Sequence, residues 1–142
     1  MRNSTILSGI IGAIGAVFST AWGGWTTGMS TLLIFMGIDY LTGLIVAGVF
    51  KKSNKSESGA LESRAGWKGL CRKGMTLLIV LIAYRLDLML GTSYIRDAVV
   101  ITFAVNEALS IFENAALMGL PLPAVLVKAL DVLKQKASFE EE

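Results

Sequence analysis

A loop rich in lysine and arginine separates two strongly apolar blocks of this chain, and this arrangement constrains the fold more than any other feature. The segment Lys51–Lys73 holds seven basic residues and two acidic ones. The flanking blocks are apolar enough to enter a bilayer, and short loops this rich in Lys and Arg stay in the cytoplasm during insertion. The pattern predicts a membrane protein with several crossings and with this loop inside the cell.

Composition supports this class and argues against others. The chain is 54% hydrophobic and 17% charged, whereas soluble domains carry roughly 25% charged residues. Histidine is absent and Cys71 is the single cysteine, so the usual metal ligand, the usual general base and an intrachain disulfide are all missing. We therefore expect no enzyme and no cofactor. The basic residues are interpreted as a topology signal, so nucleic acid is not an expected partner.

The apolar blocks divide into about four predicted spans, each near the roughly 20 residues that a crossing needs. The spans are about 5–22, 29–50, 74–90 and 95–118. The first two come from a stretch without charge, Asn3–Ile38, which a cluster of glycines and threonines at 23–28 interrupts. The fourth stops before Gly119 and Pro121, a typical helix end.

The first span is the least certain of the four because glycines and hydroxyl residues lower its hydrophobicity. Gly9, Gly12 and Gly15 lie in its middle. A segment lying at the membrane interface is one alternative. A cleaved signal peptide, with Arg2 as its basic region, is another.

Orientation follows from the basic loop. With two spans on each side, both termini fall in the cytoplasm together with the loop, and residues 1–120 form a transmembrane helical domain. The residues that carry this topology signal are Lys51, Lys52, Lys55, Arg72 and Lys73.

The segment 121–142 has a different pattern. Leu126, Leu130 and Leu133 share one helical face, and Lys128 and Asp131 fall on the other. This predicts a short amphipathic helix followed by an acidic tail in the cytoplasm. The helix is expected either to lie on the inner membrane surface or to pack on the cytoplasmic loop or on a neighbour's tail.

Five ionisable residues fall inside the predicted spans, where charge is costly. A charged side chain at the centre of a span costs roughly 2.5–3.5 kcal/mol, so these side chains must face protein or water. The five are Asp39, Arg85, Asp87, Glu107 and Glu113. With one base against four acids, Arg85 is expected to pair with Glu107 or Asp39, and the other acids to be protonated or hydrated.

The fourth span concentrates its polar residues on one face, within about 140° of arc. They are Thr102, Asn106, Glu107, Ser110, Glu113 and Asn114. Two interpretations remain open. The face is either a hydrogen-bonded network between helices of one subunit, or a surface that lines water in a homo-oligomer.

Small residues recur every three or four positions on two spans and would let helices approach closely. They are Gly9, Gly12, Ala13 and Ala16 in the first span, and Gly43 and Ala47 in the second. Packing within a subunit and self-association are both compatible with this pattern.

Four fragments, taken in order, are similar to the toxin-secretion/phage-lysis holin family. They are DYLTG (Asp39–Gly43), GWKGLCRK (Gly66–Lys73), NEALSIFEN (Asn106–Asn114) and GLPLP (Gly119–Pro123). The similarity extends from about Asp39 to Leu133. The positions that match the family are Asp39, Gly43, Arg72, Lys73, Asn106, Glu107, Ser110, Glu113 and Asn114.

The resemblance implies a function that composition alone does not. Holins of this family accumulate in the bacterial cytoplasmic membrane and assemble into lesions. A cell-wall hydrolase (the endolysin) or, in relatives, a large toxin escapes through the lesions without a required direct contact. The expected partners are thus further copies of the chain and the lipid bilayer. A small ion or solute channel and a membrane assembly subunit are the alternatives.

Overall fold

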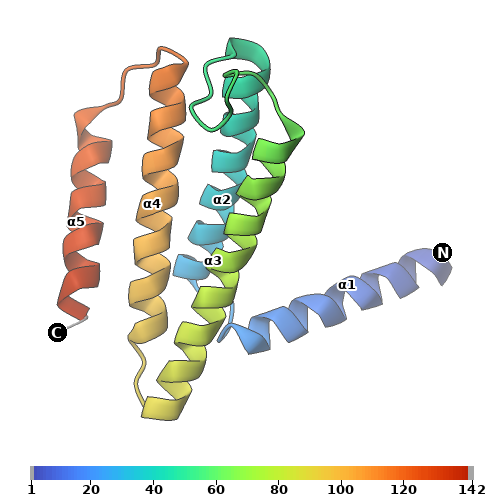
Figure 1. Ribbon diagram of the computed structural model, residues 1–142. Coiled ribbons are helices and arrows are strands. Elements are labelled where there is room, and N and C mark those ends of the chain that lie inside the picture. Colours follow the sequence, from blue (N-terminus) through green and yellow to red (C-terminus); the bar gives the residue numbers. More distant parts are fainter. Residues whose placement is uncertain (1, 141–142) are drawn as a thin grey trace.

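The computed structural model describes residues 2–140 and the side chains of residues 2–138, and this part of the chain is helical without any strand (Figure 1). The helices are α1 (Arg2–Ala21), α2 (Thr27–Ile45), α3 (Ser63–Leu90), α4 (Ile95–Leu117) and α5 (Ala124–Glu140), and a π-helical turn, η1 (Val46–Phe50), prolongs α2. The predicted all-α class is confirmed. The side chains of the predicted acidic tail lie outside the described residues.

Two segments of the described chain are long and apolar enough to cross a membrane, Arg2–Trp22 and Thr27–Phe50. They correspond to the first two predicted spans. The third helix differs from its prediction, because α3 begins at Ser63 and not near Gly74. The C-terminal half of the basic loop therefore belongs to a helix. The number of crossings, expected to be four, stays a prediction.

Helices α2, α3 and α4 form a bundle, and their apolar side chains meet in one core (Figure 1). The fully or nearly buried members of this core are Met29, Leu32, Met36, Val80, Val100 and Ala104. Large apolar side chains also cover the outside of the bundle, among them Ile34, Leu41, Leu78, Ile82 and Leu109. An exterior this apolar suits contact with lipid or with other subunits.

Helix α1 extends away from the bundle (Figure 1), and it buries none of its residues. The chain rejoins the bundle at the end of α1, where Phe18 and Trp22 pack against the core. The indole Nε1 of Trp22 donates a hydrogen bond to the carbonyl of Leu77 at 2.7 Å. The apolar surface of α1 is thus free for lipid or for another protein.

Arg96 fastens the turn between α1 and α2 to the start of α4. Its guanidinium donates to the carbonyl oxygens of Trp22 at 3.0 Å and Gly23 at 2.6 Å. Gly23 has a φ of 85°, and a Cβ at this position would lie 2.5 Å from Nη1 of Arg96. Glycine is therefore required here both by conformation and by space.

Helix α5 runs antiparallel to α4 and packs along it (Figure 1). Leu130 and Ala137 are buried, while Lys128, Asp131 and Lys134 are exposed. Of the three leucines predicted to share the apolar face, Leu130 is buried, whereas Leu126 and Leu133 are 43% and 39% exposed. Helix α5 rests on α4, a partner that neither sequence-based alternative includes.

Candidate functional site

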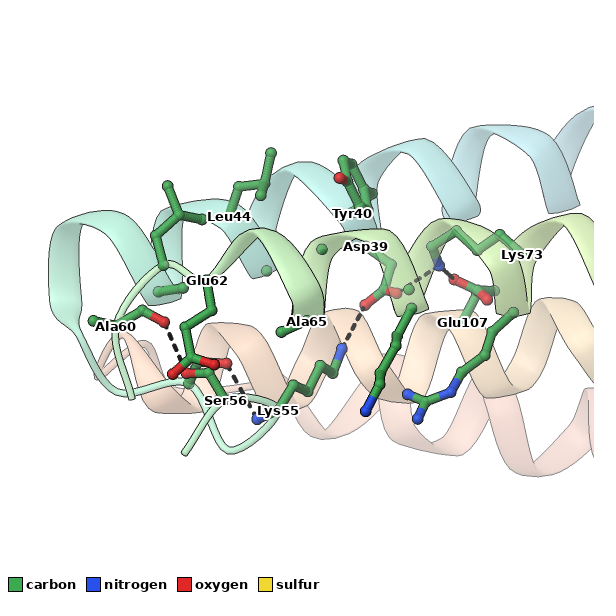
Figure 2. Close-up of a pocket in the computed structure, with 18 of the residues that line it drawn as sticks. Asp39, Tyr40, Leu44, Lys55, Ser56, Ala60, Glu62, Ala65, Lys73 and Glu107 are labelled. Carbon is green, nitrogen blue, oxygen red and sulfur yellow. Dashed lines mark hydrogen bonds and ion pairs between the residues drawn. The ribbon is translucent and has the colours of Figure 1, made fainter. Parts of the chain in front are cut away.

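Three charged side chains from three different helices meet inside the bundle. Lys73 of α3 places its Nζ 2.7 Å from Oδ2 of Asp39 on α2 and 2.5 Å from Oε2 of Glu107 on α4 (Figure 2). We call Asp39, Lys73 and Glu107 the Lys73 cluster. One ammonium group thus bridges two carboxylates and ties α2, α3 and α4 together.

The Lys73 cluster is largely shielded from solvent. The side chains of Asp39, Lys73 and Glu107 are 7%, 15% and 15% exposed. At such a site an unpaired charge is strongly destabilising, whereas a bridged set is tolerated. The two carboxylates would repel each other without the ammonium between them, so the cluster depends on Lys73.

Asn114 adds a second tie between α4 and α2. Its Nδ2 donates to the hydroxyl of Thr42 at 2.8 Å and lies 3.3 Å from both the backbone and one carboxylate oxygen of Asp39. Asn114 is buried, and a Cβ at Gly43 would lie 3.9 Å from the same Nδ2. The small residue at Gly43 therefore lets the Asn114 amide approach α2.

The loop after η1 folds back over the polar end of α4. The ammonium of Lys55 lies 3.8 Å from Oδ1 of Asp39 and donates to the hydroxyl of Ser110 at 3.2 Å. The amide of Asn54 donates to Oε1 of Glu113 at 2.7 Å. Residues of the predicted topology loop thus contact Asp39 of the second predicted span and Ser110 and Glu113 of the fourth.

The loop itself is held by local hydrogen bonds. Ser53 donates its N–H to the carbonyl of Gly59 at 2.9 Å, and the hydroxyl of Ser56 donates to the carbonyl of Ala60 at 2.7 Å. The hydroxyl and N–H of Ser58 both donate to Oε1 of Glu62, and these bonds hold the pKa of the Glu62 carboxyl below its usual value. The loop is therefore an ordered cap.

The predicted polar face of α4 divides between two neighbours. Glu107, Ser110, Glu113 and Asn114 bond to α2, α3 or the loop, as described above. Thr102 and Asn106 border a hollow between α4 and α5, which Lys134, Ala137 and Ser138 line from the other side. Within the described part of the subunit, four of the six residues of this face therefore make polar contacts with other elements, and a role of the face in a homo-oligomer stays a prediction.

The expected ion pair of Arg85 is wrong. Arg85 is exposed, and Lys73 takes the place between Asp39 and Glu107 that the sequence analysis had assigned to it. The sequence pattern marks Lys73 as a topology residue at the end of the loop and as a position that matches the family, but not as an ion-pair partner of Asp39 and Glu107. Because α3 already begins at Ser63, Lys73 lies ten residues inside a helix and reaches the bundle interior. The place of Lys73 in the fragment GWKGLCRK was the sequence signal that could have shown it to be a residue of the bundle.

Asp87 belongs to a different part of the molecule, the turn between α3 and α4. Its carboxylate accepts hydrogen bonds from the Thr92 hydroxyl at 2.6 Å and from the N–H groups of Ile95 at 3.0 Å and Arg96 at 2.9 Å. It thereby satisfies two of the free N–H groups at the start of α4. The structure does not bring Asp87 to the Lys73 cluster.

The small residues fall into two groups. Ala47 is buried and Gly43 packs beside Asn114. By contrast, a Cβ at Gly9 or Gly12 would meet nothing within 4 Å, and Ala13 and Ala16 are exposed. The α2 positions therefore serve packing within the subunit, whereas the α1 positions lie on an exposed surface of their helix.

The polar contacts of this site hold α2, α3, α4 and the loop together. Within residues 2–140 no three His, Cys, Asp or Glu side chains gather as metal ligands would. The cluster can exist either as a closed ion-paired set or, if the helices separate, as hydrated charges. The chemical property that the site offers is thus a change between an ion-paired state and a hydrated state.

Comparison with known proteins places the chain among phage-related membrane proteins. The model of the bacteriophage holin family matches residues 16–135. A Bacillus phage phi105 protein named "Probable holin" is 34% identical over 107 residues, covering 75% of this chain and 73% of its own length.

Several similar bacterial proteins are named only as uncharacterized. An uncharacterized protein of Listeria innocua is 37% identical and covers 94% of this chain and 90% of its own length. An uncharacterized 14.9 kDa protein of Clostridium perfringens is 38% identical, with coverages of 87% and 89%. No solved structure matches the chain.

Proposed function

Because this chain belongs to the bacteriophage holin family, we propose that it acts as a holin: copies assemble in the bacterial cytoplasmic membrane and open lesions that release an endolysin or a toxin. The observation that carries the proposal is the Lys73 cluster. It holds three charged groups inside a bundle whose outer surface carries many large apolar side chains, while Arg85 and Glu113 remain exposed. Such a subunit is suited to accumulate in lipid before it permeabilises the membrane.

The lesion would form when the polar face of α4 exchanges its partners within the subunit for water. Exposing a charge to lipid costs roughly 2.5–3.5 kcal/mol on insertion scales, so a single subunit has no favourable way to open. Several subunits can place these faces around a shared water-filled space. Opening is then cooperative, which suits a protein that accumulates first and acts later.

Helix α5 would have to leave its position along α4 in this process. Its exposed residues Lys128, Asp131 and Lys134 would lie at the depth of α4 in a membrane, at a similar cost for each charge. On the cytoplasmic surface the same helix keeps its charges in water and its apolar face in the interface. Its departure would also open the hollow that Asn106 borders.

The cargo needs no binding site on this chain, because a lesion of sufficient width passes a folded protein without recognition. The small ion or solute channel and the membrane assembly subunit are alternatives with the same fold. They differ from a holin in the size of the solute that crosses.

Substitution of the acids on α4 tests the proposal in cells that also produce an endolysin. Glu107→Leu and Glu113→Leu are expected to insert in normal amounts and to fail in permeabilisation, because a lesion lined by leucine is poorly hydrated. The matched control is Glu57→Leu, the same change at an exposed loop position, which should lyse on schedule. Normal lysis by both α4 variants would show that the polar face of α4 only holds the subunit together and does not line the lesion.

Topology is tested by cysteine labelling in a Cys71→Ser background. The Ser56→Cys variant is expected to react with an impermeant thiol reagent only in inverted vesicles, because the basic loop is held inside. The Ser93→Cys variant, in the turn after α3, is expected to react in intact cells. Labelling of the Ser56→Cys variant from outside would overturn the orientation.

A further inference from the structure

A cavity of about 280 Å³ lies beside the Lys73 cluster, between α2, α3 and the loop (Figure 2). One part of its wall is apolar and contains Tyr40, Leu44, Ala47 and Leu61. Another part is basic and contains Lys68 and Arg72. The cavity thus joins an apolar wall to a cationic one.

Lys68 and Arg72 form no ion pair within the part of the chain whose side chains are described. Lys68 and Arg72 are four residues apart on α3 and therefore share a face. Both are exposed. Their charge is available to a ligand.

The acids that line the same cavity are already engaged. Asp39 and Glu107 hold Lys73 between them. Glu62 accepts two hydrogen bonds from Ser58 within the loop. An anion entering between Lys68 and Arg72 would therefore meet two uncompensated bases and acids whose charge is partly satisfied.

The position of the cavity identifies the kind of anion. It lies where η1 ends and α3 begins, which the basic loop assigns to the cytoplasmic face, where anionic headgroups lie and basic pockets between helices bind them. Exposed apolar side chains, including Leu41 on α2 and Leu70 on α3, lie on the outer surfaces of the two helices that form the cavity. A ligand with a phosphate and an acyl chain matches both walls, whereas a free phosphate would leave the apolar one unused.

We propose that this cavity binds an anionic phospholipid of the cytoplasmic leaflet, with its phosphate between Lys68 and Arg72 and its first acyl carbons against Leu44 and Leu61. The inference rests on the topology in the proposed function. A bound lipid would brace the loop that covers Asp39 and Ser110. The inner-leaflet lipid would thereby stabilise the closed subunit.

The test is native mass spectrometry of the full chain released from nanodiscs that contain phosphatidylglycerol and phosphatidylcholine with identical acyl chains. The wild type is expected to retain phosphatidylglycerol selectively. The double variant Lys68→Gln/Arg72→Gln should retain roughly thirtyfold less, since each of the two bases near the surface contributes about 1 kcal/mol to anionic lipid binding. The matched control Lys51→Gln/Lys52→Gln removes the same charge from exposed residues outside the cavity and should retain it normally.

Two results would overturn the inference. Equal losses in both double variants would show a diffuse surface attraction and no site. Displacement of phosphatidylglycerol by millimolar glycerol phosphate would show a site for soluble phosphate. Arg72→Lys serves as a folding control and should keep most of the retention.

Retention is measured without any lesion, which separates this inference from the proposed function. Selective retention by a chain that never lyses cells would support the lipid site and contradict the holin. Lysis on schedule by a chain that does not retain phosphatidylglycerol selectively would support the holin and contradict the lipid site.

Discussion

Replacement of Lys73 by glutamine is expected to destabilise the closed subunit more than any other single substitution considered for this chain. The change leaves the carboxylates of Asp39 and Glu107 facing each other without the ammonium that now lies 2.7 and 2.5 Å from them. Loss of one partner from a fully buried pair costs about 3–5 kcal/mol. Since Lys73 and Glu107 keep 15% exposure, we expect a loss near the lower end of that range. Thermal unfolding in detergent, followed by circular dichroism, measures it.

The same variant is expected to permeabilise cells earlier than the wild type at equal protein amount, because its helices separate more readily. Lys52→Gln, an exposed lysine in the same basic loop, is the control and should change neither stability nor timing. Adding Asp39→Asn and Glu107→Gln to Lys73→Gln removes both unpaired charges and should restore much of the stability. A Lys73→Gln variant that unfolds like the wild type would contradict the role of the cluster.

Replacement of Asp87 by alanine is expected to have the second largest effect. It removes the acceptor for the Thr92 hydroxyl and for the N–H groups of Ile95 and Arg96. Donors left unsatisfied at a buried site cost about 1–3 kcal/mol, and loss of a helix cap has a similar magnitude. Asp87→Asn keeps one carbonyl oxygen as an acceptor and should lose less.

Hydrogen exchange tests the effect of Asp87→Ala at individual amides. The amides of Ile95 and Arg96 should exchange faster in Asp87→Ala than in the wild type, while amides near the Lys73 cluster change less. Unchanged exchange at both amides would show that water or another group replaces the carboxylate, and the capping role would be withdrawn.

Helical class and most helix positions could be predicted from this sequence because they depend on local signals. Charge-free apolar stretches, the glycine-rich breaks and the stop at Gly119 and Pro121 each act over a few residues. The polar face of α4 was also predictable, since helical periodicity alone brings Glu107 and Asn114 onto one side.

The partners of that face could not be predicted, because pairing depends on how helices dock. Arg85 was favoured by its depth along a span, yet α3 turns Lys73 inward and leaves Arg85 exposed. Lys73 was misread because it stands where the basic loop and the apolar span meet. Only the start of α3 at Ser63 shows that Lys73 is a residue of the bundle.

Asp87 and α5 illustrate the same limit of local patterns. Asp87 lies eight residues before the helix start at Ile95, too far for a local capping signal, and the turn at 91–94 brings the two together. The amphipathic face of α5 was evident, but its match to the α4 surface near Asn106 required both helices in place.

The most direct test of the central claim is a size series of solutes across vesicles that contain the purified chain. Fluorescent markers from small dyes to dextrans as large as a folded enzyme are enclosed, and the release of each is followed after assembly is allowed. A holin is predicted to release the largest dextrans together with the dyes, and Glu107→Leu to release neither. Release of small dyes alone would indicate a channel, release of nothing would indicate an assembly subunit, and either result would contradict the proposed lesion.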